Sequence, residues 1–135
     1  MRLIISEAIL TENFTNANVK IGQRYDESDV YAYIQRMHRN PDDFWEGDIS
    51  DRIEKYPTYV AMEVPVGQIQ MDEFSIDEDD VEKYVEMYQS KGTYPPLVLG
   101  GKSLGKYTII DGTHRANALA QSGLKSIVCF VGTKK

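Results

Sequence analysis

The five residues from Asp111 to Arg115 bring a carboxylate, a glycine, a hydroxyl, an imidazole and a guanidinium together within IIDGTHRANALA. Asp111 ends a run of β-forming residues, and the segment after Arg115 has helical spacing, with Ala116, Leu119 and Ala120 on one face. Asp-Gly is also a strong hairpin signal, but the helical spacing that follows opposes a hairpin. The sequence therefore predicts a sharp strand-to-helix turn at the glycine.

Such a turn exposes the first amides of the helix, which have no intrahelical partner and lie at the positive end of the helix dipole. Arg115 adds a fork of donors that suits phosphate. A phosphate site is therefore the natural hypothesis. Three plainer interpretations stay open: Asp111 caps the helix, His114 hydrogen-bonds only within the fold, and Arg115 pairs with an acidic helix.

A helix between residues 75 and 92 has the clearest signals of any element in the chain. Ser75 and Glu78 have the spacing of a capping box, and Gly92 suits the C-terminal cap. The acids at 77 to 80 lie favourably at the positive helix start. Its apolar stripe consists of Val81, Tyr84, Val85 and Tyr88.

Short β-rich runs flank this helix. YVAMEVPV is closed by Pro65 and predicts an edge strand or a strand end. PPLVLGG and KYTIID, joined by Gly-Lys-Ser-Leu-Gly, predict a hairpin with a flexible tip, and SIVCFVG predicts the final strand. The order strand, helix, strand, strand, helix, strand predicts an α+β domain over residues 59–135, preceded by a mostly helical extension, residues 1–58.

Within the extension, Val30, Ile34 and Met37 recur at helical spacing after two candidate caps, Asp26 and Ser28. The following stretch, DDFWEGDISDRIEKYPTY, mixes aromatic and acidic residues without a period and predicts a loop or short helix.

Charge is divided unevenly along the chain, whose net value is −6. Residues 1–39 carry five basic and five acidic groups, residues 40–90 three and fifteen, and residues 91–135 seven and one. The acidic average opposes a protein that coats nucleic acid, whereas the basic last segment suits a phosphate-bearing ligand.

The single cysteine, Cys129, excludes an internal disulfide framework and a multi-thiolate metal site. The apolar run in MRLIISEAIL is too short for a secretion signal or a membrane span. We therefore expect a cytoplasmic protein that does not associate with membranes.

YPPLVLGG followed by KYTIIDGTHRANALAQSGLKSIVCFV resembles the ParB/sulfiredoxin superfamily, whose signature is a strand ending in Gly-x-His-Arg or Gly-Glu-Arg-Arg and then an alanine-rich helix. VPVGQIQMDEFSIDEDDVEKYVEMYQSKGTYPPLVL matches the preceding half of the pattern, so the resemblance covers about residues 60–132. It implies a ParB/sulfiredoxin-like fold, a small mixed sheet with helices that binds a nucleotide such as ATP at this turn.

The resemblance implies that Gly112, Thr113, His114 and Arg115 surround the nucleotide phosphates, with Asp111 close by. If a nucleoside triphosphate and Mg²⁺ bind, Arg115 neutralises phosphate charge, His114 donates to a terminal oxygen and Thr113 donates to phosphate. Asp111 holds the metal, directly or through water, or acts as a base. Asp111 and His114 are therefore the candidate catalytic residues.

Departures from the family pattern remove two activities. Sulfiredoxins place a catalytic cysteine where this chain has Thr113, and a hydroxyl is a poor nucleophile without a strong base. ParB clamps have Gly-Glu-Arg-Arg and add a helix-turn-helix and a dimerisation domain, for which we expect no residues after Lys135. Sulfiredoxins also contact ATP from the helix before the Pro-Pro strand, where this chain has Asp80, Lys83 and Met87, and only Lys83 suits a phosphate.

The first functional hypothesis is a nucleotide-binding domain that hydrolyses or transfers the terminal phosphate of a nucleoside triphosphate. The alternative is a non-catalytic module that binds a nucleotide, or a protein partner through the N-terminal residues around Trp45. A ParB-like DNA nuclease ranks third, because one Asp with one His makes no two-metal cluster and the acidic middle repels a duplex.

Overall fold

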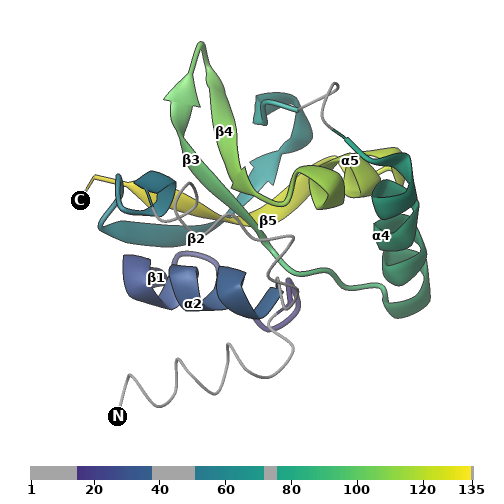
Figure 1. Cartoon of the computed structure of the whole chain (residues 1–135), viewed down its shortest axis with the longest axis horizontal. Helices are drawn as coiled ribbons and strands as arrows, with labels where there is room; N and C mark the ends of the chain where they lie inside the picture. The colour runs from purple at the N-terminus through teal and green to yellow at the C-terminus, as the bar shows by residue number, and fades with distance from the viewer. Residues whose placement is uncertain (1–14, 38–50, 72–75, 135) are drawn as a thin grey trace.

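The computed structural model describes residues 15–37, 51–71 and 76–134. In these residues five strands form one sheet in the order β1-β2-β5-β3-β4 (Figure 1). The strands are β1 (Arg24–Asp26), β2 (Thr58–Pro65), β3 (Leu97–Ser103), β4 (Lys106–Asp111) and β5 (Ser126–Thr133). The helices include α2 (Glu27–Met37), the short 3-10 helix η2 (Val66–Gln68), α4 (Glu78–Lys91) and α5 (Thr113–Gln121), and residues 51–53 are also helical. From β2 onward the predicted α+β order is confirmed.

The centre of the sheet is covered on both faces, because residues 127–131 of β5 are all buried. β5 runs parallel to β3 and antiparallel to β2, and the remaining neighbours are antiparallel. On one face Phe130 meets Tyr33 of α2 edge-on, with ring centroids 5.3 Å apart. Cys129, its neighbour in β5, is fully buried and pairs with Leu97 of β3.

The segment 15–37 belongs to the same hydrophobic core as the sheet. Val30 and Ile34 are buried on α2 as their spacing predicts, and Asp26 directly precedes the helix. β1 was not predicted, because three residues are too few to show alternation, yet it pairs with β2. The predictions for the side chain of Met37 and for the residues around Trp45 lie outside the described residues.

The structure decides or corrects three local predictions. Of the two alternatives for the strand closed by Pro65, the strand end is confirmed and the edge strand is wrong, because β2 lies between β1 and β5 and ends at Pro65. α4 is capped by Asp77, whose carboxylate accepts from the amide of Asp79 at 2.9 Å, so the predicted cap by Ser75 is wrong, and Ser75 itself lies outside the described residues. The C-terminal cap is Gly92, as predicted, with φ 70°.

The third correction concerns the β3–β4 hairpin, whose turn is tighter than expected. The strands extend to Ser103 and Lys106, which leaves only Leu104 and Gly105 between them. Both have positive φ, 55° and 81°, as in the two-residue turns that match strand twist. Leu104 is fully exposed at this tip, which lies far from α5 (Figure 1).

β4 ends the sheet, and segment 51–71 contacts its backbone. Arg52 donates to the carbonyls of Ile109 and Ile110, and the amide of Gln70 donates to the Tyr107 carbonyl at 2.8 Å. No helix in the described part of the chain is long and apolar enough to cross a membrane.

Candidate functional site

Gly112 forms the turn between β4 and α5. It is the N-terminal cap residue of α5, with φ 108° and ψ 25°, a left-handed conformation that favours glycine. A Cβ atom here would lie 2.7 Å from Leu97 Cδ2 and 2.9 Å from Arg115 Nη2. Conformation and close packing therefore both require glycine, and the predicted strand-to-helix turn is present.

The outer side of the turn consists of Thr113 and His114, which are both half-buried. The first backbone bond of α5 runs from the Ala116 amide to the Gly112 carbonyl at 2.8 Å, so the amides of residues 113–115 precede the helical ladder. No side chain caps this helix, so the interpretation of Asp111 as its cap is wrong.

His114 joins the starts of two helices. Its Nε2 atom accepts a hydrogen bond from the Asp77 amide, the cap residue of α4, at 2.9 Å. A ring nitrogen that accepts carries no proton, so neutral His114 holds its proton on Nδ1. The proposed intramolecular hydrogen bond of His114 is thus present, whereas its catalytic role stays a prediction. Asp77 was not expected to take part in the site.

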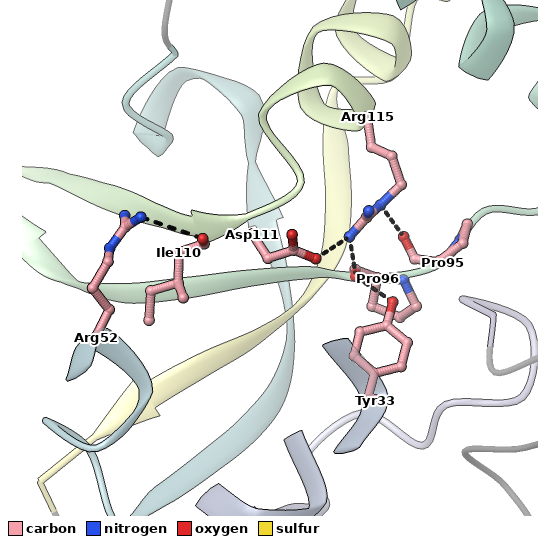
Figure 2. A network of polar contacts seen from close by, with 7 residues as sticks. All are labelled: Tyr33, Arg52, Pro95, Pro96, Ile110, Asp111 and Arg115. Carbon is pink, nitrogen blue, oxygen red and sulfur yellow. Dashed lines mark hydrogen bonds and ion pairs between the residues drawn. The ribbon is translucent and has the colours of Figure 1, made fainter. Parts of the chain in front are cut away.

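The inner side of the turn is the Arg115 guanidinium, which is 2% exposed. Its Nε donates to the Pro95 carbonyl at 3.2 Å and its Nη2 to the Pro96 carbonyl at 3.1 Å, and Nη2 also lies 3.4 Å from Asp111 Oδ2 (Figure 2). The guanidinium therefore points under the turn, and its ion pair is with Asp111 of β4 instead of the acidic helix.

Electrostatics keep this buried guanidinium charged. Burial lowers the pKa of Arg115, but Tyr33, Asp111 and Tyr84 outweigh burial and raise it above its ordinary value. The Tyr84 ring centroid lies 6.0 Å from Arg115 Cζ. Asp111 is 8% exposed, so most of its carboxylate is turned into the protein beside Arg115.

Tyr33 completes the inner network and was missed by sequence reasoning. Its hydroxyl donates to the Pro96 carbonyl at 2.6 Å (Figure 2). Burial, above all, raises the pKa of Tyr33, and nearby Asp111 adds to the rise while Arg115 opposes it. The only sequence signal was its helical spacing with Val30 and Ile34, which indicates burial but no partner.

Lys83 lies exposed on α4, with Nζ 5.8 Å from the Tyr84 ring centroid. The same ring and Arg115 help to line a mainly apolar cavity of about 10 Å³ between α4 and α5. Lys83 thus lies on α4, the helix whose cap residue Asp77 is hydrogen-bonded to His114 of the turn. In the described ranges, no three His, Cys, Asp or Glu side chains are grouped so that they could hold a metal ion.

Three solved structures of proteins with different functions match about half of this chain. A chromosome-partitioning protein ParB from Caulobacter crescentus, complexed with CTP-γ-S, is 25% identical, with 53% of this chain and 43% of that chain covered and a TM-score of 0.46. A free serine kinase in complex with ADP is 19% identical, with 53% and 30% covered and a TM-score of 0.49. Sulfiredoxin from Arabidopsis thaliana is 24% identical, with 53% and 83% covered and a TM-score of 0.45.

The matched region is thus less than half of the partitioning protein and of the kinase. No curated protein matches this chain. The model of the ParB N-terminal domain family matches residues 52–135, which include the turn, α4 and four of the five strands. The chain belongs to the ParB N-terminal domain family.

Proposed function

We propose that this protein binds a nucleotide at the β4–α5 junction, with the phosphates at the start of α5. The observation that carries the proposal is the Gly112 turn, which presents the first amides of α5 beside the half-buried side chains of Thr113 and His114. Family membership supports it, because the superfamily resemblance implies a nucleotide at this turn. Helix-start amides and the helix dipole attract phosphate in this geometry.

The residues divide the work of binding between them. The amides and the Thr113 hydroxyl donate to phosphate oxygens. His114 donates through Nδ1, or through Nε2 once this nitrogen has released the Asp77 amide and gained a proton. Arg115 contributes a fixed positive charge from below, since its donors are held by carbonyls and Asp111. Lys83 reaches the phosphates from α4.

We further propose that the bound ligand is a nucleoside triphosphate whose terminal phosphate is hydrolysed or transferred. Bound magnesium would neutralise phosphate charge during such a reaction. Asp111 offers one carboxylate that is largely buried beside Arg115, so it fits a contact to the ion through water better than a direct one. His114 stabilises the terminal phosphate oxygens.

Titration calorimetry with CTP, ATP, GTP and ADP, each with and without magnesium, tests binding. Two matched pairs of variants test the site. Thr113→Val should weaken binding and Thr108→Val, a half-buried threonine of β4, should not. Lys83→Gln should weaken binding and Lys102→Gln should not, although both lysines lie near a tyrosine ring. No heat from any nucleotide, or equal effects within each pair, would contradict the proposed site.

A second candidate function is a nucleotide-binding module without catalysis. It is favoured because Asp111, Arg115 and His114 all have partners within the fold. Asp111 pairs with Arg115, and His114 accepts a hydrogen bond from the Asp77 amide. Release of inorganic phosphate, or labelling of an acceptor by the terminal phosphate, separates the two functions. Tight binding of a triphosphate that stays intact over many binding lifetimes supports the module, and steady phosphate release that is lost in His114→Gln supports the enzyme.

A further inference from the structure

Tyr33 belongs to a part of the chain that the family model does not match, yet its hydroxyl reaches the β4–α5 junction. Tyr33 and Pro96 lie 63 positions apart in the sequence. We propose that Tyr33 is a positioning residue for the nucleotide site: by sharing the Pro96 carbonyl with Arg115 it fixes the guanidinium and, through it, the Gly112 turn. This inference rests on the proposed nucleotide function.

The Pro96 carbonyl is the point at which the two side chains meet. It accepts from Tyr33 Oη at 2.6 Å and from Arg115 Nη2 at 3.1 Å (Figure 2). A carbonyl oxygen has two acceptor sites, so both are used. Pro96 is buried and directly precedes β3, which begins at Leu97. Loss of the Tyr33 hydroxyl would therefore leave a buried acceptor half-satisfied and give the guanidinium room to shift.

The Tyr33 ring is itself held firmly. It is 2% exposed, and its edge-on contact with Phe130 has a centroid distance of 5.3 Å and an interplanar angle of 77°. Phe130 is 1% exposed in the central strand β5. A ring fixed between a helix and the middle of the sheet gives its hydroxyl one position, which suits a group that positions another.

Arg115 transmits this position to the turn through close contact. A Cβ atom on Gly112 would lie 2.9 Å from Arg115 Nη2 and 3.2 Å from Cζ, so the guanidinium lies directly against the turn backbone. The amide of Arg115 also belongs to the first turn of α5. Movement of the guanidinium therefore moves the amides that are proposed to hold phosphate.

The test compares Tyr33→Phe with Tyr25→Phe. Tyr25 is the matched control because it is 8% exposed and also meets Phe130 edge-on, with a centroid distance of 5.1 Å. NMR spectra of both variants would follow the amides of residues 112–114 and the Arg115 Nε–H group, which Arg115→Lys identifies. Titration calorimetry would follow the affinity for CTP and ADP with magnesium.

We expect Tyr33→Phe to shift the turn amides, to speed hydrogen exchange at Arg115 Nε–H and to weaken nucleotide binding about 3- to 10-fold, with none of these effects in Tyr25→Phe. Equal spectra of the turn in both variants would overturn the inference, as would a shifted turn with unchanged affinity. If the unaltered protein binds no nucleotide, the proposed function fails, and the turn spectra still show whether Tyr33 positions the turn.

Discussion

The two sides of the Gly112 turn carry neighbouring residues with opposite surroundings. On the inner side Arg115 and Asp111 are buried, and the guanidinium is bound to the Pro95 and Pro96 carbonyls. On the outer side His114 is half-buried with one hydrogen bond at the surface. A buried charge requires a complete set of partners, whereas a surface group can exchange its partner for a ligand. One side therefore fixes the turn, and the other is able to bind.

The largest effect should come from Arg115→Met on the inner side. The substitution removes the positive charge that pairs with the buried Asp111 carboxylate, takes the Arg115 donor from the Pro95 carbonyl and leaves the Pro96 carbonyl with Tyr33 alone, so the free energy of unfolding should fall by about 3 to 5 kcal/mol. Urea denaturation followed by circular dichroism measures the loss. Lys83→Met on the exposed face of α4 is the control and should change stability by less than about 0.5 kcal/mol. Similar losses in both variants would mean that the inner network does not hold the fold.

Gly112→Ala should have the next largest effect. The substitution imposes a left-handed conformation on alanine and places its Cβ 2.7 Å from Leu97 Cδ2, which together should cost about 2 to 4 kcal/mol. Gly123→Ala is the matched control, because φ is 92° there and no heavy atom beyond the neighbouring residues of the chain lies within 4 Å of the added Cβ. The control should lose only about 1 to 2 kcal/mol in the same denaturation measurement. An equal cost at both positions would show that the turn is not tightly packed.

Alkaline pH should lower the free energy of unfolding through the buried thiol of Cys129. Burial raises the pKa of this thiol, and nearby Arg115 opposes the rise only in part. The folded protein therefore keeps a proton that the unfolded chain loses above about pH 8.5. The free energy of unfolding should be unaffected by this group below that pH and should fall above it, by up to about 1.4 kcal/mol per pH unit.

Denaturation midpoints of the unaltered protein and of Cys129→Ala, measured from about pH 7.5 to 9.5, check this prediction. The two stability curves should be parallel below about pH 8.5 and should converge above it, because the variant lacks the titrating thiol. Curves that stay parallel throughout would show that the Cys129 thiolate is tolerated in the folded state.

Among the substitutions in the turn itself, the smallest change in stability should come from His114→Gln on the outer side. Its single hydrogen bond to the Asp77 amide is solvent-exposed, so its loss should cost less than about 1 kcal/mol, although nucleotide affinity should fall. Long-range nitrogen–proton NMR spectra report the imidazole tautomer, and His114→Gln identifies its signals among the two histidines. We expect the proton on Nδ1 in the free protein. A proton on Nε2 would contradict the hydrogen bond to Asp77.

Local signals in the sequence predicted most elements of the fold. Gly112 and Gly92 marked helix ends because their backbone conformations require glycine, and the buried face of α2 followed from apolar spacing. The loop between β3 and β4 was predicted to be longer than it is. Leucine rarely adopts a positive φ, so the sequence does not indicate a two-residue turn at Leu104; the twist of the paired strands imposes it.

The arrangement of the site was less predictable, since it depends on contacts between distant segments. Residues 111–115 lie on one strand-to-helix turn, as the sequence predicted, but the sequence did not show that Arg115 points inward and His114 outward. Direction was decided by the Pro95 and Pro96 carbonyls and by Tyr33, which come from two other segments. Neither a backbone carbonyl nor the hydroxyl of a buried tyrosine leaves a recognisable pattern in one sequence.

The contacts that Arg52 and Gln70 make to β4 have a consequence for solubility. β4 is the last strand of the sheet, and an edge strand with unpaired backbone groups is a template for the strand of another molecule. Arg52 occupies the carbonyls of Ile109 and Ile110, and the Gln70 amide occupies that of Tyr107, so both ends of β4 already have partners. By occupying these carbonyls, segment 51–71 opposes the pairing of β4 with a strand of another molecule, and so opposes edge-to-edge aggregation.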